Sequence, residues 1–208
     1  MRNLRFSLLS AAVLAVFGIS FPSAANAQAY KVESSKPVFD DLSSPEFNVS
    51  KQKSFKPKDW LEIEASFKIQ ISPEPPSKTA ERVMVKWYVA VEHPDKKGAY
   101  LLLTKEITHV NVPLNEDIFS SVYLSPASIM RITGRDRAGK SVVNLVGYEV
   151  LINGEKVAQE TSKSQAGWWS TASDKISRSD TVPLLNKSET PFASMWWDRY
   201  AEILVERR

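Results

Sequence analysis

The strongest structural signal in the chain is a strict two-residue alternation that begins after Trp60. Apolar side chains occupy every second position, at Leu61, Ile63, Ala65, Phe67, Ile69 and Ile71, with polar or charged residues between them. Successive side chains of a strand point to opposite faces, so this pattern predicts a half-buried strand. The proline-rich residues 73–76 end it, because proline cannot continue a central ladder.

Further strand signals follow at short, turn-separated intervals. Residues 81–93 are apolar on both faces and predict a central strand, and residues 99–112, 119–126, 128–133, 141–152 and 155–162 continue the rhythm. Asn153-Gly154 is a strong hairpin signal between the last two segments. We therefore predict an all-β fold, an antiparallel sandwich in residues 59–208.

The two ends of the chain differ from this middle part. Residues 1–27 carry Arg2 and Arg5, an apolar run and a small-residue site at Ala25-Asn26-Ala27, which predicts an export signal peptide cleaved after Ala27. A retained anchor is the alternative. Residues 28–58 read as an extended arm or linker in which Val38-Phe39 and Phe47 are able to pair along a sheet edge.

The last residues predict one short amphipathic helix. Thr190 is a capping residue, Pro191 suits the first helical position, and Phe192, Met195, Trp196 and Tyr200 follow at helical spacing. This places Trp196 on the apolar stripe and Trp197 further round the helix.

The charge balance excludes a strongly basic protein. The whole chain has 27 basic and 24 acidic residues, and loss of Arg2 and Arg5 with the signal peptide leaves 25 to 24. We expect no nucleic-acid partner, because a strong basic field is missing. After cleavage no second apolar segment is long enough to span a membrane.

The stretch Gly134–Ser141 matches the P-loop pattern for nucleotide phosphates. That pattern requires a strand before the glycines and a helix after the lysine. Here Lys140 is followed by a β-branched, aromatic segment that runs into the Asn-Gly hairpin. We therefore predict a solvated loop and no nucleotide.

Catalytic residue types are scarce. The chain has no cysteine and only two histidines, His93 and His109, and it contains no metal-binding histidine spacing and no nucleophile-elbow motif. We expect no catalytic, cofactor or metal site. A small exported hydrolase that uses His93 or His109 with an unrecognised partner remains an alternative.

Paired tryptophans are the one unusual chemical feature. Trp168-Trp169 and Trp196-Trp197 offer rings that could stack on a sugar or anchor a protein partner. The possible partner or glycan contacts are Trp168, Trp169 and Trp197, and a carbohydrate-binding module is a second alternative. The competing interpretation is that these rings are aromatic core, because tryptophan is highly buried on average.

Two features resemble an immunoglobulin-like domain. Trp87 lies where such sandwiches bury a tryptophan on a central strand, and Tyr148-Glu149-Val150 is similar to a tyrosine corner with valine in place of cysteine. The missing disulfide is a departure from antibody domains and does not affect the wider architecture.

The cysteine-free chain and its ending, residues 187–203, resemble the secreted pilus-like family of Akkermansia and related Verrucomicrobia. The resemblance implies an immunoglobulin-like protein of a type IV pilus-like system, and it brings no motif that assigns functional residues. The chain departs from true type IV pilins, because Gly18 is not followed by a retained helix with an early glutamate. We therefore expect a non-catalytic, exported envelope protein, periplasmic, outer-surface or secreted, that binds envelope or pilus-assembly proteins or further copies of itself.

Overall fold

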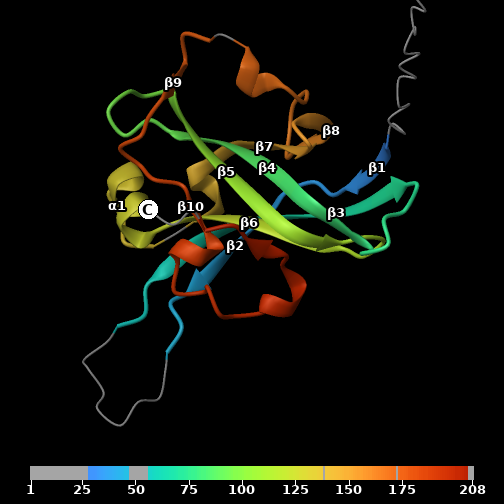
Figure 1. The fold of residues 1–208 in the computed structure, drawn as a ribbon. Coiled ribbons are helices and arrows are strands. Elements are labelled where there is room, and N and C mark those ends of the chain that lie inside the picture. Colours follow the sequence, from blue (N-terminus) through green and yellow to red (C-terminus); the bar gives the residue numbers. More distant parts are fainter. Residues whose placement is uncertain (1–27, 47–55, 138, 172, 206–208) are drawn as a thin grey trace, which may run out of the picture.

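The computed structural model describes residues 28–46, 56–137, 139–171 and 173–205. Two β-sheets pack face to face in these residues (Figure 1). Sheet A has the order β1-β3-β6-β10, and β2 pairs with the same long strand β3 as β1 does. Its strands are β1 (Ala29–Ser34), β2 (Val38–Ser43), β3 (Asp59–Ser72), β6 (Ile118–Leu124) and β10 (Leu185–Asn186).

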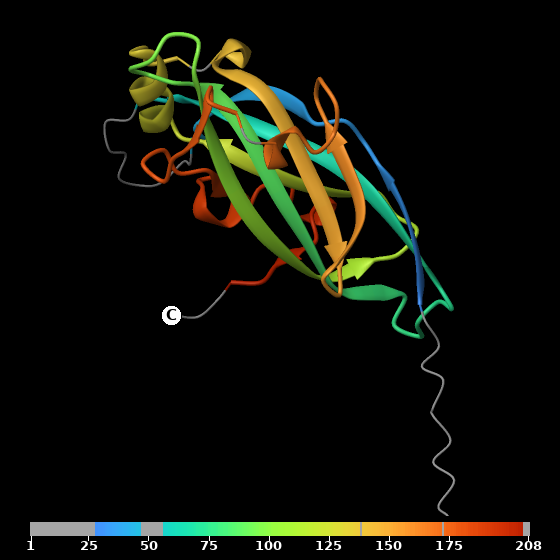
Figure 2. The same ribbon diagram turned by 90° about the horizontal axis from the view of Figure 1, so that it is seen from above.

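Sheet B has the order β11-β5-β4-β7-β8, and the short strand β9 runs parallel to β5. Its strands are β4 (Thr79–Glu92), β5 (Tyr100–Pro113), β7 (Val143–Ile152), β8 (Glu155–Thr161), β9 (Ile176–Arg178) and β11 (Glu202–Ile203). Viewed from above, the long strands β4, β5 and β7 run side by side along the molecule (Figure 2). The prediction of an all-β sandwich is confirmed.

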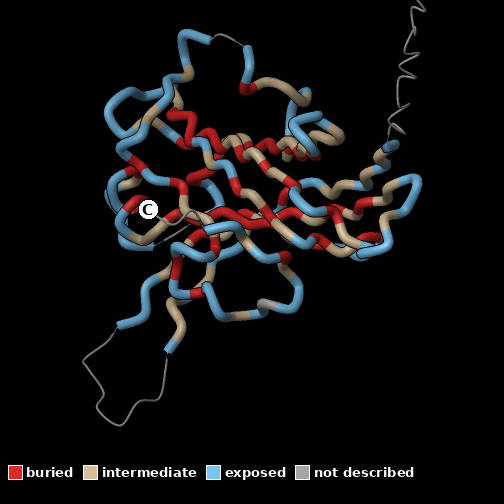
Figure 3. The backbone as a smooth tube through the Cα atoms, viewed as in Figure 1, coloured by how far each residue is buried: buried red, intermediate tan, exposed pale blue. Residues whose placement is uncertain are grey.

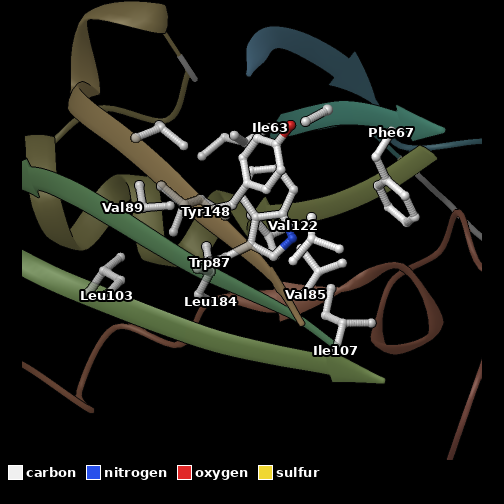
Figure 4. Packing of buried hydrophobic residues seen from close by; sticks show 14 of the residues in the cluster. Ile63, Phe67, Val85, Trp87, Val89, Leu103, Ile107, Val122, Tyr148 and Leu184 are labelled. Atoms are coloured by element: carbon white, nitrogen blue, oxygen red, sulfur yellow. The ribbon is translucent and has the colours of Figure 1, made fainter. Parts of the chain in front are cut away.

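The alternation predicted for residues 61–71 determines which side chains of β3 belong to the core. The apolar positions of β3, from Leu61 to Ile69, are buried between the sheets, and the polar positions between them lie on the outer face of sheet A. Buried residues follow the two sheets through the middle of the molecule (Figure 3). Trp87 on the central strand β4 is fully buried, as predicted, and its ring packs against Tyr148 at a centroid distance of 5.0 Å (Figure 4).

Tyr148 does not form a tyrosine corner. Its hydroxyl donates a 2.6 Å hydrogen bond to the carbonyl of Ser35, which follows β1 in the opposite sheet. A tyrosine corner bonds to the backbone a few residues upstream, whereas this bond joins the two sheets at their edge. Ser34 strengthens the same junction by donating to Glu160 of β8 over 3.3 Å.

The residues expected as an arm or linker contribute strands to the sandwich. β1 pairs with residues 67–72 of β3 and β2 pairs with residues 59–64, so the two form one interrupted edge strand. Phe47, the signal peptide and its alternative as an anchor lie outside the described residues. No helix in the described part of the chain is long and apolar enough to cross a membrane.

An α-helix is present, but it lies in a different part of the chain from the helix that was predicted at the C-terminal end. The α-helix of the described residues is α1 (Pro126–Thr133), in a segment predicted as strand. Ser125 caps it by accepting the Ser128 N–H, and Ile129 and Ile132 bury one face. Gly134 ends it with φ of 68°, a left-handed conformation that glycine adopts without strain.

The P-loop match therefore starts at a helix C-cap. Gly134 follows α1, and at the other end of the match Lys140 begins the 3₁₀ turn η1 (Lys140–Val142), which leads into β7. Phosphate binding requires a strand before the glycines and a helix after the lysine, which is the reverse order.

The predicted C-terminal helix is absent. Residues 187–203, the C-terminal segment, form the 3₁₀ turns η3 (Lys187–Glu189) and η4 (Trp197–Arg199) and the strand β11. Lys187 is buried, and its ammonium donates hydrogen bonds to the carbonyls of Ala193 and Met195. The segment winds around this ammonium, and the carbonyls that a helix would pair with backbone N–H groups bond to the side chain instead.

A chain of hydrogen bonds crosses the core from sheet to sheet. The Trp87 indole Nε1–H donates to Ser120 Oγ of β6 over 3.2 Å, and His109 Nε2 of β5 lies 3.1 Å from the same oxygen. His109 Nδ1 lies 3.3 Å from the carbonyl of Ala201. A carbonyl only accepts, so the hydrogen sits on Nδ1 and Nε2 accepts the Ser120 hydroxyl proton.

Burial of His109 predicts a pH-dependent stability. Desolvation lowers the pKa of its imidazole from 6.5 to about 4, opposed by the hydrogen bond to Ala201. Between these values the unfolded chain binds more protons than the folded one. The free energy of unfolding should therefore fall as pH is lowered from about 6.5 to about 4, by up to about 3 kcal/mol from this residue.

Urea unfolding of the wild type, His109→Asn and His93→Asn across this pH range checks the prediction. His109→Asn should be less stable at neutral pH and should show a flatter pH dependence than the wild type. His93 follows the last residue of β4, and its side chain accepts the nearby Asp95 N–H, so His93→Asn should keep the wild-type slope. An unchanged slope in His109→Asn would contradict the assignment.

Candidate functional site

The one serine–histidine pair of hydrogen-bonded side chains among the described residues is sealed in the core. Ser120 and His109 are each about 1% exposed, and Ser120 Oγ also accepts the Trp87 N–H. A nucleophile and its base require contact with the substrate, which this burial prevents. His93 is used in a turn, where its Nδ1 accepts the Asp95 N–H over 3.1 Å.

Within the described ranges, no group of three or more histidine, cysteine, aspartate or glutamate side chains is arranged to hold a metal ion.

The first tryptophan pair lies against the outer face of sheet B, in the 3₁₀ turn η2 (Trp168–Ser170). Trp169 is buried and stacks on Tyr88 of β4 at 4.8 Å and 8° between ring planes. Its ring also lies directly on Gly147 of β7, where any Cβ would come within about 2.0 Å of the indole. Trp169 therefore packs as part of the structure, and within the described residues its Nε1 has no hydrogen-bond partner.

Trp168 is more accessible than its neighbour. It packs edge-on against Trp169 at 5.7 Å, and its Nε1–H donates to Thr161 Oγ1 over 3.2 Å. Its contact with a partner or glycan stays a prediction. Trp197 begins η4, and its side chain lies outside the described part of the structure.

The outer face of sheet A carries a second aromatic layer. The C-terminal segment lies on this side of the sandwich, opposite the segment with η2 (Figure 1). Phe192 is buried there, stacked on Tyr123 of β6 at 5.6 Å and edge-on to Trp60 of β3 at 5.9 Å. Trp196 stacks on Phe192 at 6.5 Å and is 49% exposed, so the prediction that Trp196 lies on a buried helical stripe was wrong.

Carboxylates line the part of this face that the C-terminal segment leaves open. Asp40 of β2 pairs in register with Glu62 of β3, and Glu64 follows two residues later on the same face. A pocket of about 260 Å³ lies above them. We call it the acidic groove, and its lining includes Asp40, Leu42, Glu62, Glu64, Trp196 and Arg199.

Two tyrosines and an arginine hold the groove carboxylates in place. The Tyr123 hydroxyl donates to Glu62 over 2.5 Å, and Glu64 accepts from the Tyr200 hydroxyl and from Arg199 over 2.7 Å. Burial raises the pKa of Glu62, the Tyr123 hydrogen bond opposes that rise, and the neighbouring Glu64 adds to it. The groove is thus a preformed, negatively charged surface.

Sequence patterns do not reveal this groove. In the sequence, Glu62 and Glu64 stand out only as polar positions of an alternating strand. The alternation does place Glu62 and Glu64 on one face. Their meeting with Asp40 and Trp196 depends on the register of β2 and on the path of the C-terminal segment.

The contact between Gly147 and Trp169 generates a prediction. Gly147→Ala should destabilise the protein by about 1–3 kcal/mol, because the new methyl group overlaps the indole ring. In a Trp169→Ala background the same change should cost far less. Thermal or urea unfolding of the two single variants and the double variant measures this coupling.

Gly139→Ala is the matched control. Its backbone φ is −147°, and the nearest atom to a new Cβ is Ser141 Oγ at 3.5 Å, so it should change stability little. Equal costs of Gly147→Ala with and without Trp169 would show that this packing is wrong.

Comparisons with known proteins agree with this architecture. A protein-family model matches residues 23–207. A solved crystal structure of a protein from Akkermansia muciniphila matches with a TM-score of 0.82 and 38% sequence identity, covering 87% of this chain and 96% of that one. A comparison with curated proteins finds no match. The chain therefore belongs to the protein family whose model it matches, together with this Akkermansia muciniphila protein.

Proposed function

We propose that the protein is a non-catalytic component of the cell envelope that is exported and binds other proteins, in association with a type IV pilus-like system. Membership of a family with a relative in Akkermansia muciniphila is consistent with a non-catalytic protein. The signal-peptide pattern of residues 1–27 supports export. The pilus association is proposed because the cysteine-free chain and its ending, residues 187–203, resemble the secreted pilus-like family.

The observation that carries the binding role is the acidic groove beside strand β2. It is the place where an exposed aromatic ring, fixed carboxylates and a sheet edge occur together. Catalysis would require reactive groups in contact with a substrate, whereas the serine–histidine pair lies in the core. Exposed aromatic residues next to polar groups are typical of recognition surfaces.

A carbohydrate-binding role is the second candidate, and the exposed ring of Trp196 favours it. One face of the ring lies on Phe192, and the carboxylates of Asp40 and Glu62 line the same pocket. A sugar could stack on the ring and donate hydroxyl hydrogens to these acceptors.

Proximity labelling in the native cell tests the proposed function. We expect a labelling enzyme fused after Arg208 to mark envelope proteins, with pilus-assembly components enriched among them. A chain lacking residues 2–27 is the control and should mark cytoplasmic proteins instead. Labelling of cytoplasmic proteins by the full chain would contradict export, and envelope labelling without pilus-assembly components would contradict the pilus association.

A further inference from the structure

We propose that the acidic groove and the free edge of β2 together form a docking site for an extended, cationic segment of a partner protein. The inference deepens the proposed function, because it rests on a protein-binding role and assigns the chemistry of the partner. Three properties of the site carry it: an available strand edge, an excess of negative charge and an exposed indole ring.

The outer edge of β2 has backbone groups that no described strand pairs. The Ser44 N–H donates to the Lys58 carbonyl, so residues 44 and 58 form a hydrogen-bonded antiparallel pair. Such pairs recur at every second residue, so the backbone groups of Val38, Asp40 and Leu42 face β3. Those of Phe39, Asp41 and Ser43 consequently point away from the sheet.

The Asp41 N–H confirms this orientation. It donates to the Asp40 carboxylate of its own strand over 3.1 Å, as an N–H that points away from β3 can. An extended peptide that adds to this edge would use the same outward backbone groups. Its side chains on the outer face would then lie next to Asp40 and the acidic groove.

The charge of this region selects a cationic segment. Asp40, Glu62 and Glu64 contribute three carboxylates on the outer face of sheet A, and Asp41 adds a fourth on the opposite face of the edge strand. In the described part of the chain, Arg199 is bound to Glu64, the exposed Lys140 lies 3.6 Å from Asp40, and the charge of Lys187 also acts on Glu62. Burial is the largest cause that raises the pKa of both Glu62 and Asp41, and a neighbouring carboxylate raises each further. An added lysine or arginine side chain would offset this repulsion.

Trp196 supplies the third element. Its φ of 49° lies in the left-handed region that a bulky residue seldom adopts. Lys187 holds the carbonyl of the preceding Met195 and so contributes to this conformation. The ring keeps one face on Phe192 and remains half exposed beside the groove, where a cation can lie over it.

A second copy of the chain fits this edge poorly. Antiparallel pairing of β2 with β2 of another copy would bring Asp40 and Asp41 of both chains together. Like charges placed opposite each other across a strand pair are destabilising. Charged residues on edge strands are also a known protection against such self-pairing.

The test measures binding of a labelled peptide that alternates lysine and threonine to the full exported chain, by fluorescence anisotropy at low salt. A peptide that alternates glutamate and threonine and a neutral oligosaccharide are the comparison ligands. We expect the lysine peptide to bind with a Kd below about 1 mM. The glutamate peptide should not bind, and the oligosaccharide should not compete.

Variants separate the three elements. The double variant Asp40→Asn, Glu62→Gln should weaken binding at least about tenfold, and Trp196→Ala about threefold. Asp41→Pro removes an outward N–H and should weaken binding more than Asp41→Asn, which removes the charge alone. The matched control on other surfaces is the double variant Glu155→Gln, Asp174→Asn, which removes two carboxylates and should bind as the wild type does. Melting temperatures verify that each variant is folded.

Several outcomes would overturn the proposal. They are failure of the lysine peptide to bind, equal affinity in the groove variants, tighter binding of the oligosaccharide, and a dimer that Asp41→Pro disrupts. The last two would assign the site to a glycan or to a second copy. Because proximity labelling reports export and neighbours independently of this groove, its result distinguishes failure of the docking site from failure of the proposed function.

Discussion

The structure depends on a tryptophan that must satisfy its N–H inside an apolar core. Trp87 is fully buried on the central strand of sheet B, and a buried donor without a partner would cost about 1–3 kcal/mol. Ser120 Oγ of sheet A accepts a hydrogen bond from this N–H. The Ser120 hydroxyl in turn donates to His109 Nε2, and His109 Nδ1–H donates to the Ala201 carbonyl. The chain of bonds therefore aligns both sheets with each other and with the start of the last strand.

The outer faces of the two sheets differ in how they are covered. On sheet B, Trp169 fills the space above Gly147 and stacks on Tyr88. On sheet A, Phe192 covers Tyr123, and the C-terminal segment leaves the carboxylates near β2 open. An incompletely covered face beside an available edge is a typical place for recognition, since both polar contacts and backbone pairing are accessible there.

Buried Lys187 explains the path of the C-terminal segment better than helical propensity does. Its ammonium is removed from water, which lowers its pKa, and two carbonyls of the segment compensate by accepting hydrogen bonds. The Tyr200 ring lies 4.6 Å from the same nitrogen. These contacts join residues that are several positions apart, and they take up carbonyls that a helix would pair with its own backbone N–H groups.

The sequence by itself determined strands β3 to β8, the inward side of β3, the buried Trp87 and the failure of the P-loop match, because each rests on local alternation or on the order of neighbouring segments. It also contained a cap for α1, Ser125 before Pro126, which a short strand-like segment obscured. Only the tertiary structure decided that Asp40, Glu62 and Trp196 meet in one groove, that Tyr148 bonds to Ser35, and that Lys187 shapes the chain end. These contacts join distant parts of the chain, and their formation depends on strand register and sheet packing, which local sequence patterns do not specify.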